Sequence, residues 1–179
     1  MQSEVMFAGF GGQGIMLIGQ MLAYAGMGEG KNVIWFPSYG PEMRGGTAYC
    51  TVVVSDKDIG SPIVDRPGCI AVLNRPSLEK FHKRVRTGGL LVVNTSLIDI
   101  TTDRTDLEVL NVPANQMAID GGTAKAANMC VLGAYVGKTK CVMLDSLREL
   151  VRVQSKSKPQ PIEPNLRVLE MGYALGAGG

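Results

Sequence analysis

Short apolar runs alternate along this chain with longer segments in which apolar residues recur at helical spacing. The short runs are bounded by Gly, Pro, Asn or Asp and predict strands, at residues 5–8, 32–36, 48–55, 69–73, 90–93 and 107–112. The longer segments predict helices, at residues 15–27, 76–86, 123–137, 144–153 and 166–175. Strands that alternate with helices are typical of an α/β sheet covered on both faces.

One pair of strands departs from this alternation. Residues 32–36 and 48–55 are separated only by residues 37–46, a segment rich in Gly and Pro. A parallel crossover usually needs a dozen or more residues, so we expect an antiparallel or distant placement here. The predicted fold class is therefore a three-layer α/β/α sandwich with a Rossmann-like, mixed but mostly parallel sheet.

The end of the chain predicts a separate arm. Residues 155–165 contain Pro159, Pro161 and Pro164, and residues 176–179 are Gly-Ala-Gly-Gly. We expect a main domain over residues 1–154 and, over residues 155–179, a proline-containing arm with a short helix and a frayed end.

Composition removes several classes of function. The 179 residues carry a net charge of +2, 19% charged residues, 23 glycines and one histidine, His82. A histidine-rich metal site is excluded, and so is bulk electrostatic binding to nucleic acid. The four cysteines form no Cys-x-x-Cys pair, which favours buried, reduced thiols over a metal or iron–sulfur site. Without an apparent signal peptide or membrane span, we expect a cytoplasmic protein.

A glycine loop follows the first predicted strand. Residues 9–14 read Gly-Phe-Gly-Gly-Gln-Gly and match G-x-G-x-x-G between a strand and a helix. Dinucleotide binding also requires an acidic residue at the end of the second strand, and none stands there. Three interpretations stay open: dinucleotide binding, glycines that let the helix pack closely on the sheet, and contact with a phosphate-bearing group or a partner subunit.

The loop at residues 37–46 has the most distinctive sequence in the chain. It should leave the carboxyl edge of the sheet beside the glycine loop, where open α/β sheets bind ligands. One interpretation is a surface loop with a local contact between Glu42 and Arg44, worth little in water. The other is an anchor for a partner or an anionic ligand, since Tyr, Met and Arg are enriched at interfaces.

No catalytic constellation stands out. His82 lies in the basic run Lys-Phe-His-Lys-Arg, which predicts a solvated helix face. The chain has no G-x-S-x-G or Walker A motif, and its carboxylates are scattered. We therefore predict no catalytic and no metal-binding residue.

Several stretches taken together resemble the gamma subunit (or gamma domain) of the 2-oxoacid:ferredoxin oxidoreductases. They occur in order and cover most of residues 4–137, and they are GFGGQG (9–14), WFPSYGPEMRGGT (35–47), IGSP (59–62), LNRP (73–76), GGLLVVN (88–94), VPAN (112–115), and Asn128-Met129 ahead of Leu132-Gly133. The glycine loop alone is weak, whereas its combination with SYGPEMRGGT is specific.

The resemblance implies a multisubunit enzyme that oxidatively decarboxylates a 2-oxoacid to an acyl-CoA and passes electrons to ferredoxin. Thiamine diphosphate and the iron–sulfur clusters belong to the alpha, beta or delta partner subunits. The gamma piece has a Rossmann-like fold without a tightly bound cofactor and is associated with coenzyme A. An isolated chain would then be inactive and could self-associate. The identity of the 2-oxoacid stays open among 2-oxoglutarate, pyruvate, branched-chain 2-oxoacids and indolepyruvate. Of these possibilities we favour 2-oxoglutarate or a general 2-oxoacid.

Matched positions and physical chemistry together give the candidate sites. The candidate cofactor-binding residues are Gly9, Gly11, Gly12, Gln13, Gly14, Ser38 and Arg44. The candidate partner-interface residues are Tyr39, Glu42, Met43 and Arg44. Asn94, Asn115 and Asn128 either hold adjacent loops or make local turn and cap hydrogen bonds. The competing functions are a stand-alone nucleotide-binding domain or dehydrogenase, and a purely structural subunit.

Overall fold

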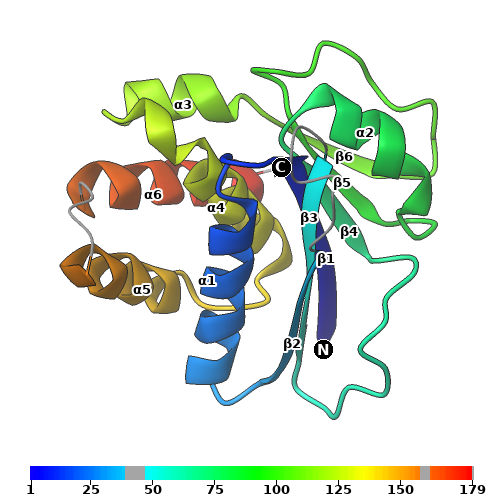
Figure 1. The fold of residues 1–179 in the computed structure, drawn as a ribbon, viewed down its shortest axis with the longest axis horizontal. Helices are drawn as coiled ribbons and strands as arrows, with labels where there is room; N and C mark the ends of the chain where they lie inside the picture. Colours follow the sequence, from blue (N-terminus) through cyan, green and yellow to red (C-terminus); the bar gives the residue numbers. More distant parts are fainter. Residues whose placement is uncertain (39–46, 158–161, 179) are drawn as a thin grey trace.

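The computed structural model describes residues 1–38, 47–157 and 162–178, and within them one sheet forms the centre of the molecule (Figure 1). Its strand order is β2-β3-β1-β4-β5-β6. The strands are β1 (Gln2–Phe10), β2 (Asn32–Pro37), β3 (Thr47–Ser55), β4 (Cys69–Val72), β5 (Leu90–Asn94) and β6 (Glu108–Val112).

The sheet is mixed, as expected. β4 pairs in parallel with β1, β5 with β4, and β6 with β5. β3 runs antiparallel to both β1 and β2, with Phe10 opposite Thr47 and Pro37 opposite Cys50. The antiparallel placement of residues 48–55 is therefore confirmed, and β2 runs in the same direction as β1.

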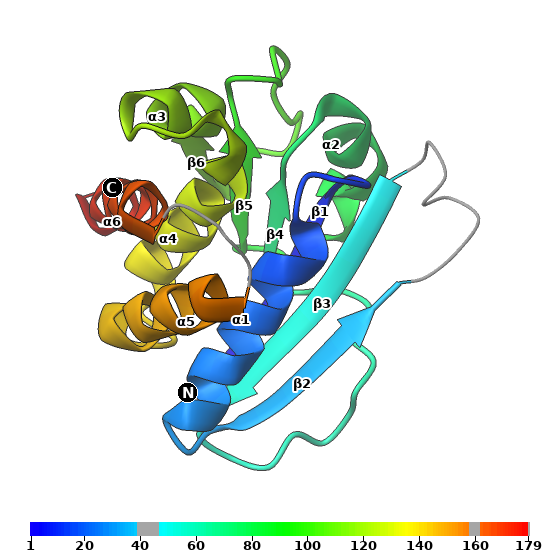
Figure 2. The same ribbon diagram turned by 60° about the vertical axis from the view of Figure 1, so that its left-hand side comes forward.

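Helices cover both faces of the sheet (Figure 2). They are α1 (Ile15–Gly28), α2 (Arg75–Phe81), α3 (Ala114–Asp120), α4 (Ala127–Thr139), α5 (Leu144–Ser157) and α6 (Ile162–Gly178), with 3-10 turns η2 (His82–Arg84) and η3 (Ala124–Ala126). None of these helices is long and apolar enough to span a bilayer.

Alternate side chains of β1 point into two separate hydrophobic cores. Val5 and Phe7 point into a large cluster with α1, α4 and α6, and Met6 and Ala8 point into a smaller cluster under α2 and η2. This alternation follows from the two-residue period of a strand. It also explains why the strand reads as a continuous apolar run, and the three-layer prediction is confirmed.

The C-terminal elements are longer than the sequence pattern indicated. α5 continues to Ser157, α6 begins at Ile162, and α6 runs on to Gly178, where we had expected a frayed end. Pro164 is tolerated because it stands in the first turn of α6, where a backbone N–H has no helical partner. Gly176 is buried in the packing of α6.

Two further expectations were wrong. The helix predicted over residues 76–86 is the short α2 followed by η2, and α3 had no predicted counterpart. His82 does not lie on a solvated face: its side chain is only 13% exposed, and its Nδ1 lies 2.9 Å from the Thr102 hydroxyl.

Candidate functional site

The glycine loop stands at the point where the strand order reverses. After β1 the chain crosses through α1 to the β2–β3 side of the sheet, whereas β4, on the other side of β1, is followed by α2 on the opposite face. Open α/β sheets bind ligands in the crevice that such a reversal leaves at the carboxyl edge. The glycine loop is therefore placed where the sequence predicted it.

The loop's glycines divide into two kinds. A Cβ on Gly9 would lie 2.6 Å from Gln13 Oε1, and a Cβ on Gly14 would lie 2.2 Å from Asn128 Nδ2. These two positions are closed by packing. Gly11 and Gly12 are exposed, and at Gly12, where φ is +92°, a Cβ would meet nothing within 4 Å. The packing interpretation holds for Gly9 and Gly14, and open space is left at Gly12.

Gln13 ties the loop to the next strand. Its Oε1 accepts hydrogen bonds from Phe10 N (2.7 Å) and Asn74 Nδ2 (3.1 Å), and its Nε2 donates to Leu73 O (3.4 Å). Asn74 also caps α2, because its Oδ1 accepts from Ser77 N at 2.9 Å. Sequence analysis missed Asn74 as a site residue, although an Asn two residues before a Pro is a helix-start signal.

Asn94 connects β4, β5 and α3. Its Nδ2 donates to Leu73 O (3.2 Å) and to Asn115 Oδ1 (2.8 Å), while its Oδ1 accepts from Ser96 N and Ala114 N. The side chain is fully buried. Of the two roles open for the asparagines, Asn94 has both: it bonds within its own turn through Ser96 N, and it holds adjacent loops through Leu73, Asn115 and Ala114.

Asn128 connects α4 to the glycine loop. Its Nδ2 donates to Gly14 O at 3.3 Å, and its Oδ1 accepts from Met129 N at 2.9 Å. These contacts enclose a pocket of about 370 Å³ at the carboxyl edge, which we call the amide pocket. It is lined by Gly12, Gln13, Leu73, Asn94, Asn115, Ala124, Lys125, Ala127 and Asn128.

A second hollow, of about 230 Å³, lies on the other flank of the glycine loop. It is lined by Phe10, Gly11, Gly12, Gly14, Ile15, Met16, Leu17 and Ala48. Ala48 is in β3, which pairs with β2. This hollow therefore lies on the flank of the glycine loop that is nearer to the carboxyl end of β2.

Ser38 follows β2 at the same edge of the sheet as the glycine loop. Its N–H donates to Tyr49 O at 3.0 Å, and β3 stands between it and β1. The other candidates from the loop, namely Tyr39, Glu42, Met43 and Arg44, lie outside the described residues.

The described end of β2 carries no acidic residue for a ribose. The strand ends with Phe36 and Pro37, followed by Ser38. The nearest described acid before the strand is Glu29, and its carboxylate binds other groups. Glu29 Oε1 accepts from Met143 N and Ser146 Oγ, and Glu29 pairs with Lys31 at 3.4 Å. This arrangement disfavours the dinucleotide interpretation.

The cysteines are free thiols in the protein interior. Burial raises the pKa of Cys50 and of Cys130 to about 12, and it raises the pKa of Cys69 and Cys141 as well. A thiol of this kind is protonated at neutral pH and is a poor nucleophile. Among the described residues, no three His, Cys, Asp or Glu side chains are grouped to hold a metal ion.

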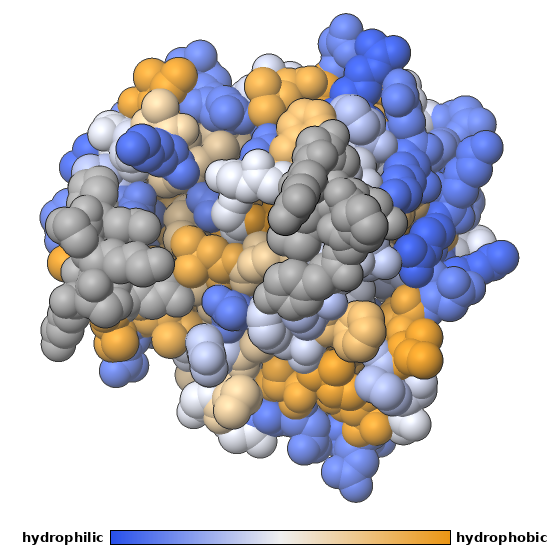
Figure 3. Space-filling model, in the orientation of Figure 1, coloured by the Kyte–Doolittle hydropathy of each residue, from blue (hydrophilic) through white to orange (hydrophobic). Residues whose placement is uncertain are grey.

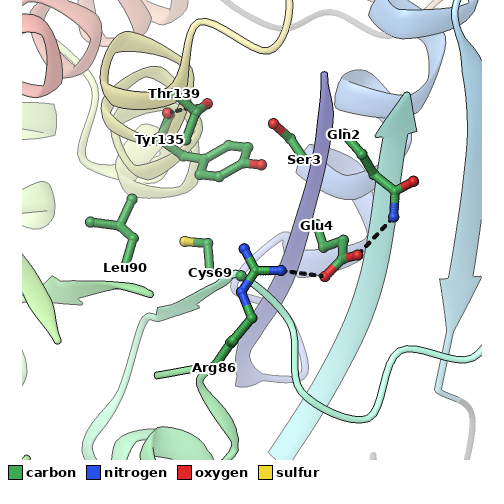
Figure 4. A pocket seen from close by; sticks show the side chains of 9 residues that line it. Gln2, Ser3, Glu4, Cys69, Arg86, Leu90, Tyr135 and Thr139 are labelled. Carbon is green, nitrogen blue, oxygen red and sulfur yellow. Dashed lines mark hydrogen bonds and ion pairs between the residues drawn. The ribbon is translucent and has the colours of Figure 1, made fainter. Parts of the chain in front are cut away.

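The opposite, amino-terminal edge of the sheet carries a smaller pocket of about 150 Å³, into which the Tyr135 ring points (Figure 4). Glu4 lies between its two partners there: Gln2 Nε2 donates to it at 2.8 Å, and Arg86 pairs with it at 4.0 Å. Burial raises the pKa of Tyr135 above its ordinary range. Because the acid and the guanidinium neutralise each other, this pocket is a weaker candidate than the carboxyl edge.

Comparison with known proteins decides the family. Residues 4–175 match the pyruvate ferredoxin/flavodoxin oxidoreductase family. The chain belongs to this family. It is 32% identical over 180 residues to the 2-oxoglutarate synthase subunit KorC of Methanocaldococcus jannaschii, covering 98% of this chain and 94% of that subunit. The resemblance found in the sequence motifs is thereby confirmed.

Other relatives of the family are much longer. The ketoisovalerate oxidoreductase subunit VorA of Methanothermobacter marburgensis is 41% identical over 171 residues, which cover 94% of this chain and 35% of VorA. This chain thus spans about a third of the length of that relative.

Solved structures share the fold. The gamma subunit of a keto/oxoacid ferredoxin oxidoreductase from Geobacter sulfurreducens matches with a TM-score of 0.84 and 26% identity, covering 99% of both chains. A 2-oxoglutarate:ferredoxin oxidoreductase from Magnetococcus marinus, solved with 2-oxoglutarate, coenzyme A and succinyl-CoA bound, matches with a TM-score of 0.89 and 23% identity, over 99% of this chain and 31% of the other.

Proposed function

We propose that this chain is the gamma-type subunit of a 2-oxoacid:ferredoxin oxidoreductase, which converts a 2-oxoacid and coenzyme A to an acyl-CoA and reduces ferredoxin. The family match over residues 4–175 carries this proposal. The fold occurs as a chain of similar length in the Geobacter gamma subunit and as about a third of a longer chain in the Magnetococcus enzyme. A unit found in both forms is expected to work in contact with other parts of an enzyme.

The chain's part in the reaction is scaffolding and binding. We assign the thiamine and iron–sulfur chemistry to alpha, beta or delta partner subunits, and contact with ferredoxin is indirect, through them. The free, buried thiols support a reducing compartment such as the cytoplasm. In the absence of partners, we expect the isolated chain to be inactive.

We assign contact with coenzyme A to the outer flank of the glycine loop. The residues proposed to hold it are Gly11 and Gly12, which border the 230 Å³ hollow, together with Ser38 and Arg44. The open space at Gly12 lets the backbone approach a phosphate, and α1 begins directly behind the loop. Gly9, Gln13 and Gly14 shape the loop through their packing contacts. When bound, coenzyme A supplies the thiol that accepts the acyl group.

The surface of α1 and β2 supports contact with a sister subunit. Tyr24 and Met27 of α1 are 55% and 60% exposed. Phe36 of β2 is 56% exposed on the other face of the sheet, because its neighbour Trp35 packs against α1. Figure 3 shows hydrophobic side chains gathered over this part of the molecule. Large exposed hydrophobic side chains are typical of an interface. The loop residues Tyr39, Glu42, Met43 and Arg44 follow β2 directly and are proposed to extend this contact.

Reconstitution tests the function. The chain is purified alone and with candidate alpha and beta subunits, and 2-oxoacid- and CoA-dependent reduction of a viologen dye is measured. We expect activity only in the complex. Full activity of the isolated chain would overturn the subunit assignment, as would a complex whose activity is unchanged when this chain is left out.

The contact with coenzyme A is tested separately in the complex. Arg44→Ala is expected to raise KM for coenzyme A by roughly tenfold or more, the loss of one charge-assisted hydrogen bond to a phosphate. KM for the 2-oxoacid should stay the same. Lys57→Ala is the matched control, because Lys57 is an exposed cation after β3, at the opposite edge of the sheet. An unchanged KM for coenzyme A in an intact complex would favour a purely structural subunit.

A further inference from the structure

β2 is the outermost strand on its side of the sheet (Figure 2), and we call its outer side the β2 edge. Within the described residues, β2 pairs only with β3. Water can satisfy the backbone groups of an edge strand, so a free edge does not by itself require a partner. Proteins nevertheless protect such edges against pairing with other chains, most often with charged side chains. Whether β2 has this protection is therefore informative.

The edge strand on the other side of the sheet, β6, is protected by charge. Its first residue, Glu108, is exposed and pairs with Lys138 at 2.6 Å. A strand added along β6 would have to desolvate or displace these charges. β2, in contrast, has no charged residue at any of its six positions. The two edges of the same sheet thus differ in the feature that prevents strand pairing.

Lys31, the charged residue next to β2, does not protect the β2 edge either. Its Nζ donates to the Cys141 carbonyl at 2.6 Å and pairs with Glu29 at 3.4 Å, so the charge is held by the protein. At the other end of the strand, Pro37 has no N–H and cannot donate to a neighbour. Residues 32–36 lie between these two ends and are suited to pairing with another strand.

The register with β3 decides which backbone groups face the β2 edge. Ser38 N donates to Tyr49 O at 3.0 Å, which makes these two residues a hydrogen-bonded pair. Such pairs recur at every second residue of an antiparallel ladder, so the even-numbered residues of β2 bond to β3. The odd-numbered residues Val33 and Trp35 therefore turn their N–H and C=O groups outward.

The side chains make the β2 edge apolar on both faces of the sheet. Val33 and Trp35 pack against the large hydrophobic core on the α1 face. Ile34 and Phe36 point to the other face, where Ile34 is half-buried and Phe36 is 56% exposed. A strand added here would gain hydrophobic contacts as well as backbone hydrogen bonds, which is the usual basis of strand addition.

A second copy of β2 fits this edge best in one antiparallel register. With Ile34 on a two-fold axis, Val33 of each copy faces Trp35 of the other, and two complete hydrogen-bonded pairs form. An axis at Val33 would set Trp35 opposite Lys31, whose N–H is already used in the turn after α1. An axis at Trp35 would set Val33 opposite Pro37, which has no N–H. Both alternatives leave a carbonyl without a donor.

We infer that the β2 edge binds a second copy of this chain, with the two β2 strands antiparallel about Ile34. One continuous sheet then runs through the dimer, with six strands from each copy. The contact is isologous, as expected for a two-fold dimer. It uses the edge of the sheet and not the outer face of α1. The inference goes beyond the proposed function and does not rest on it, because the pairing needs no other subunit.

Cysteine cross-linking of the full-length chain tests the pairing and its register. Opposed residues of a non-hydrogen-bonded pair have Cα atoms about 4.5 Å apart, within disulfide range. Ile34→Cys should therefore give a covalent dimer with the thiol oxidant diamide, seen on a non-reducing gel. Phe36→Cys is the matched control on the same face: it is more exposed, but its two copies would lie about 14 Å apart along the strands. It should cross-link at least tenfold more slowly.

A double variant tests the same register at a second pair of positions. The register sets Asn32 of one copy opposite Phe36 of the other. Asn32→Cys combined with Phe36→Cys should therefore cross-link as fast as Ile34→Cys, although each single variant is slow. Both positions are exposed, so the double variant is expected to fold.

Sedimentation equilibrium tests the association without a covalent bond. The original chain should show dimers that dissociate on dilution. Ile34→Lys should raise the dissociation constant of the dimer tenfold or more, because two like charges would meet at the axis. Val109→Lys places the same charge on the exposed part of β6 and should leave the dissociation constant unchanged. Circular dichroism checks that both variants are folded, and the cysteine variants decide the question if Ile34→Lys is not.

Three results would overturn the inference. The first is an original chain that stays monomeric up to millimolar concentration. The second is cross-linking of Phe36→Cys as fast as that of Ile34→Cys, which would show random collision. The third is equal weakening of the dimer by Val109→Lys, which would show a general charge effect. Because the isolated chain is used, these failures are distinct from failure of the oxidoreductase assay.

Discussion

At the scale of single residues, Gly14 shows how one glycine serves two requirements. Its φ is +74°, in the left-handed region that favours glycine, and a Cβ would lie 2.2 Å from Asn128 Nδ2. Gly12 has a similar φ of +92° but open space around the Cβ position. The same Gly-to-Ala change at the two sites therefore separates backbone strain from packing.

Gly14→Ala is expected to lower the free energy of unfolding by about 2–5 kcal/mol, the sum of left-handed strain and the lost hydrogen bonds of Asn128. Gly12→Ala should cost only the strain, about 1–2 kcal/mol. Urea unfolding measures both. In an Asn128→Ala background the cost of Gly14→Ala should fall to that of Gly12→Ala. An equal cost for Gly14→Ala in both backgrounds would contradict the proposed contact.

The buried thiols give a second prediction at this scale. We expect almost no reaction of the native chain with Ellman's reagent at pH 8, and reaction of all four cysteines after unfolding in guanidinium. Burial raises the pKa of Cys50 from 9.0 to about 12, so the unfolded state ionises first as the pH rises. The Cys50 contribution to stability is complete below pH 9 and decreases from pH 9 to 12.

The size of this effect is measurable. At pH 10, ionisation of one such thiol in the unfolded state alone costs roughly 1 kcal/mol of stability. Comparing urea unfolding at pH 8 and pH 10 for the original chain and for Cys50→Ala isolates the contribution. The loss of stability between the two pH values should be smaller in the variant by about this amount. Rapid labelling of the native chain at pH 8 would show instead that the thiols are accessible.

At the scale of elements, α4 and α6 cross at unusually close distance. Gly133 and Gly137 of α4 are four residues apart, and so are Gly172 and Gly176 of α6. A Cβ on any of them would lie 2.0–2.2 Å from a backbone oxygen of the other helix. Backbone atoms cannot turn aside as a side chain can, so the two helices must separate to admit even one methyl group.

Gly172→Ala is therefore expected to lower the free energy of unfolding by about 3 kcal/mol or more, at the upper end of overpacking effects. Gly178→Ala is the matched control, since a Cβ there meets nothing within 4 Å and alanine has the higher helix propensity. It should be neutral or slightly stabilising. Thermal and urea unfolding check both variants, and similar stability of the two would disprove the close crossing.

These two helices also show where prediction from sequence ends. The elements with strong local patterns were predicted correctly: apolar β-branched runs for β3 and β5, and a long proline-free apolar segment for α1. The local sequence predicts a frayed end for α6, whereas Gly172 and Gly176 pack against α4 and the helix continues to Gly178. α3 was missed because its seven residues lack a clear apolar repeat.

The candidate site was predictable only in part, because only some of its residues belong to a local sequence pattern. The glycine loop has a local motif, and its neighbourhood follows from strand direction. The amide pocket does not, because Gln13, Asn94 and Asn128 are far apart in the chain and meet only through the sheet order. Their hydrogen bonds to Leu73, Asn115 and Gly14 depend on tertiary contacts that no spacing rule encodes.

At the scale of the whole molecule, charge is distributed unevenly. Residues 5–28, which form most of β1 and all of α1, contain no Asp, Glu, Lys, Arg or His. The charged residues that follow, Glu29 and Lys31, pair with each other and are 8% and 19% exposed. The outer surface of α1 and β2 is therefore uncharged, whereas hydrophilic side chains dominate on the α2 side (Figure 3). Depletion of charge at the centre of a surface is characteristic of subunit interfaces.

Introducing charge on this surface is expected to block assembly. Tyr24→Lys and Met27→Lys should each reduce recovery of the complex with co-expressed alpha and beta subunits by roughly tenfold or more, because burying an unpaired charge costs several kcal/mol. Both side chains are more than half exposed, so unfolding of the isolated chain should change by no more than about 0.5 kcal/mol. Leu97→Lys, an equivalent change outside this surface, should leave recovery unchanged. Size-exclusion chromatography and band intensities measure recovery, and full recovery of both α1 variants would place the sister subunit on another side of the molecule.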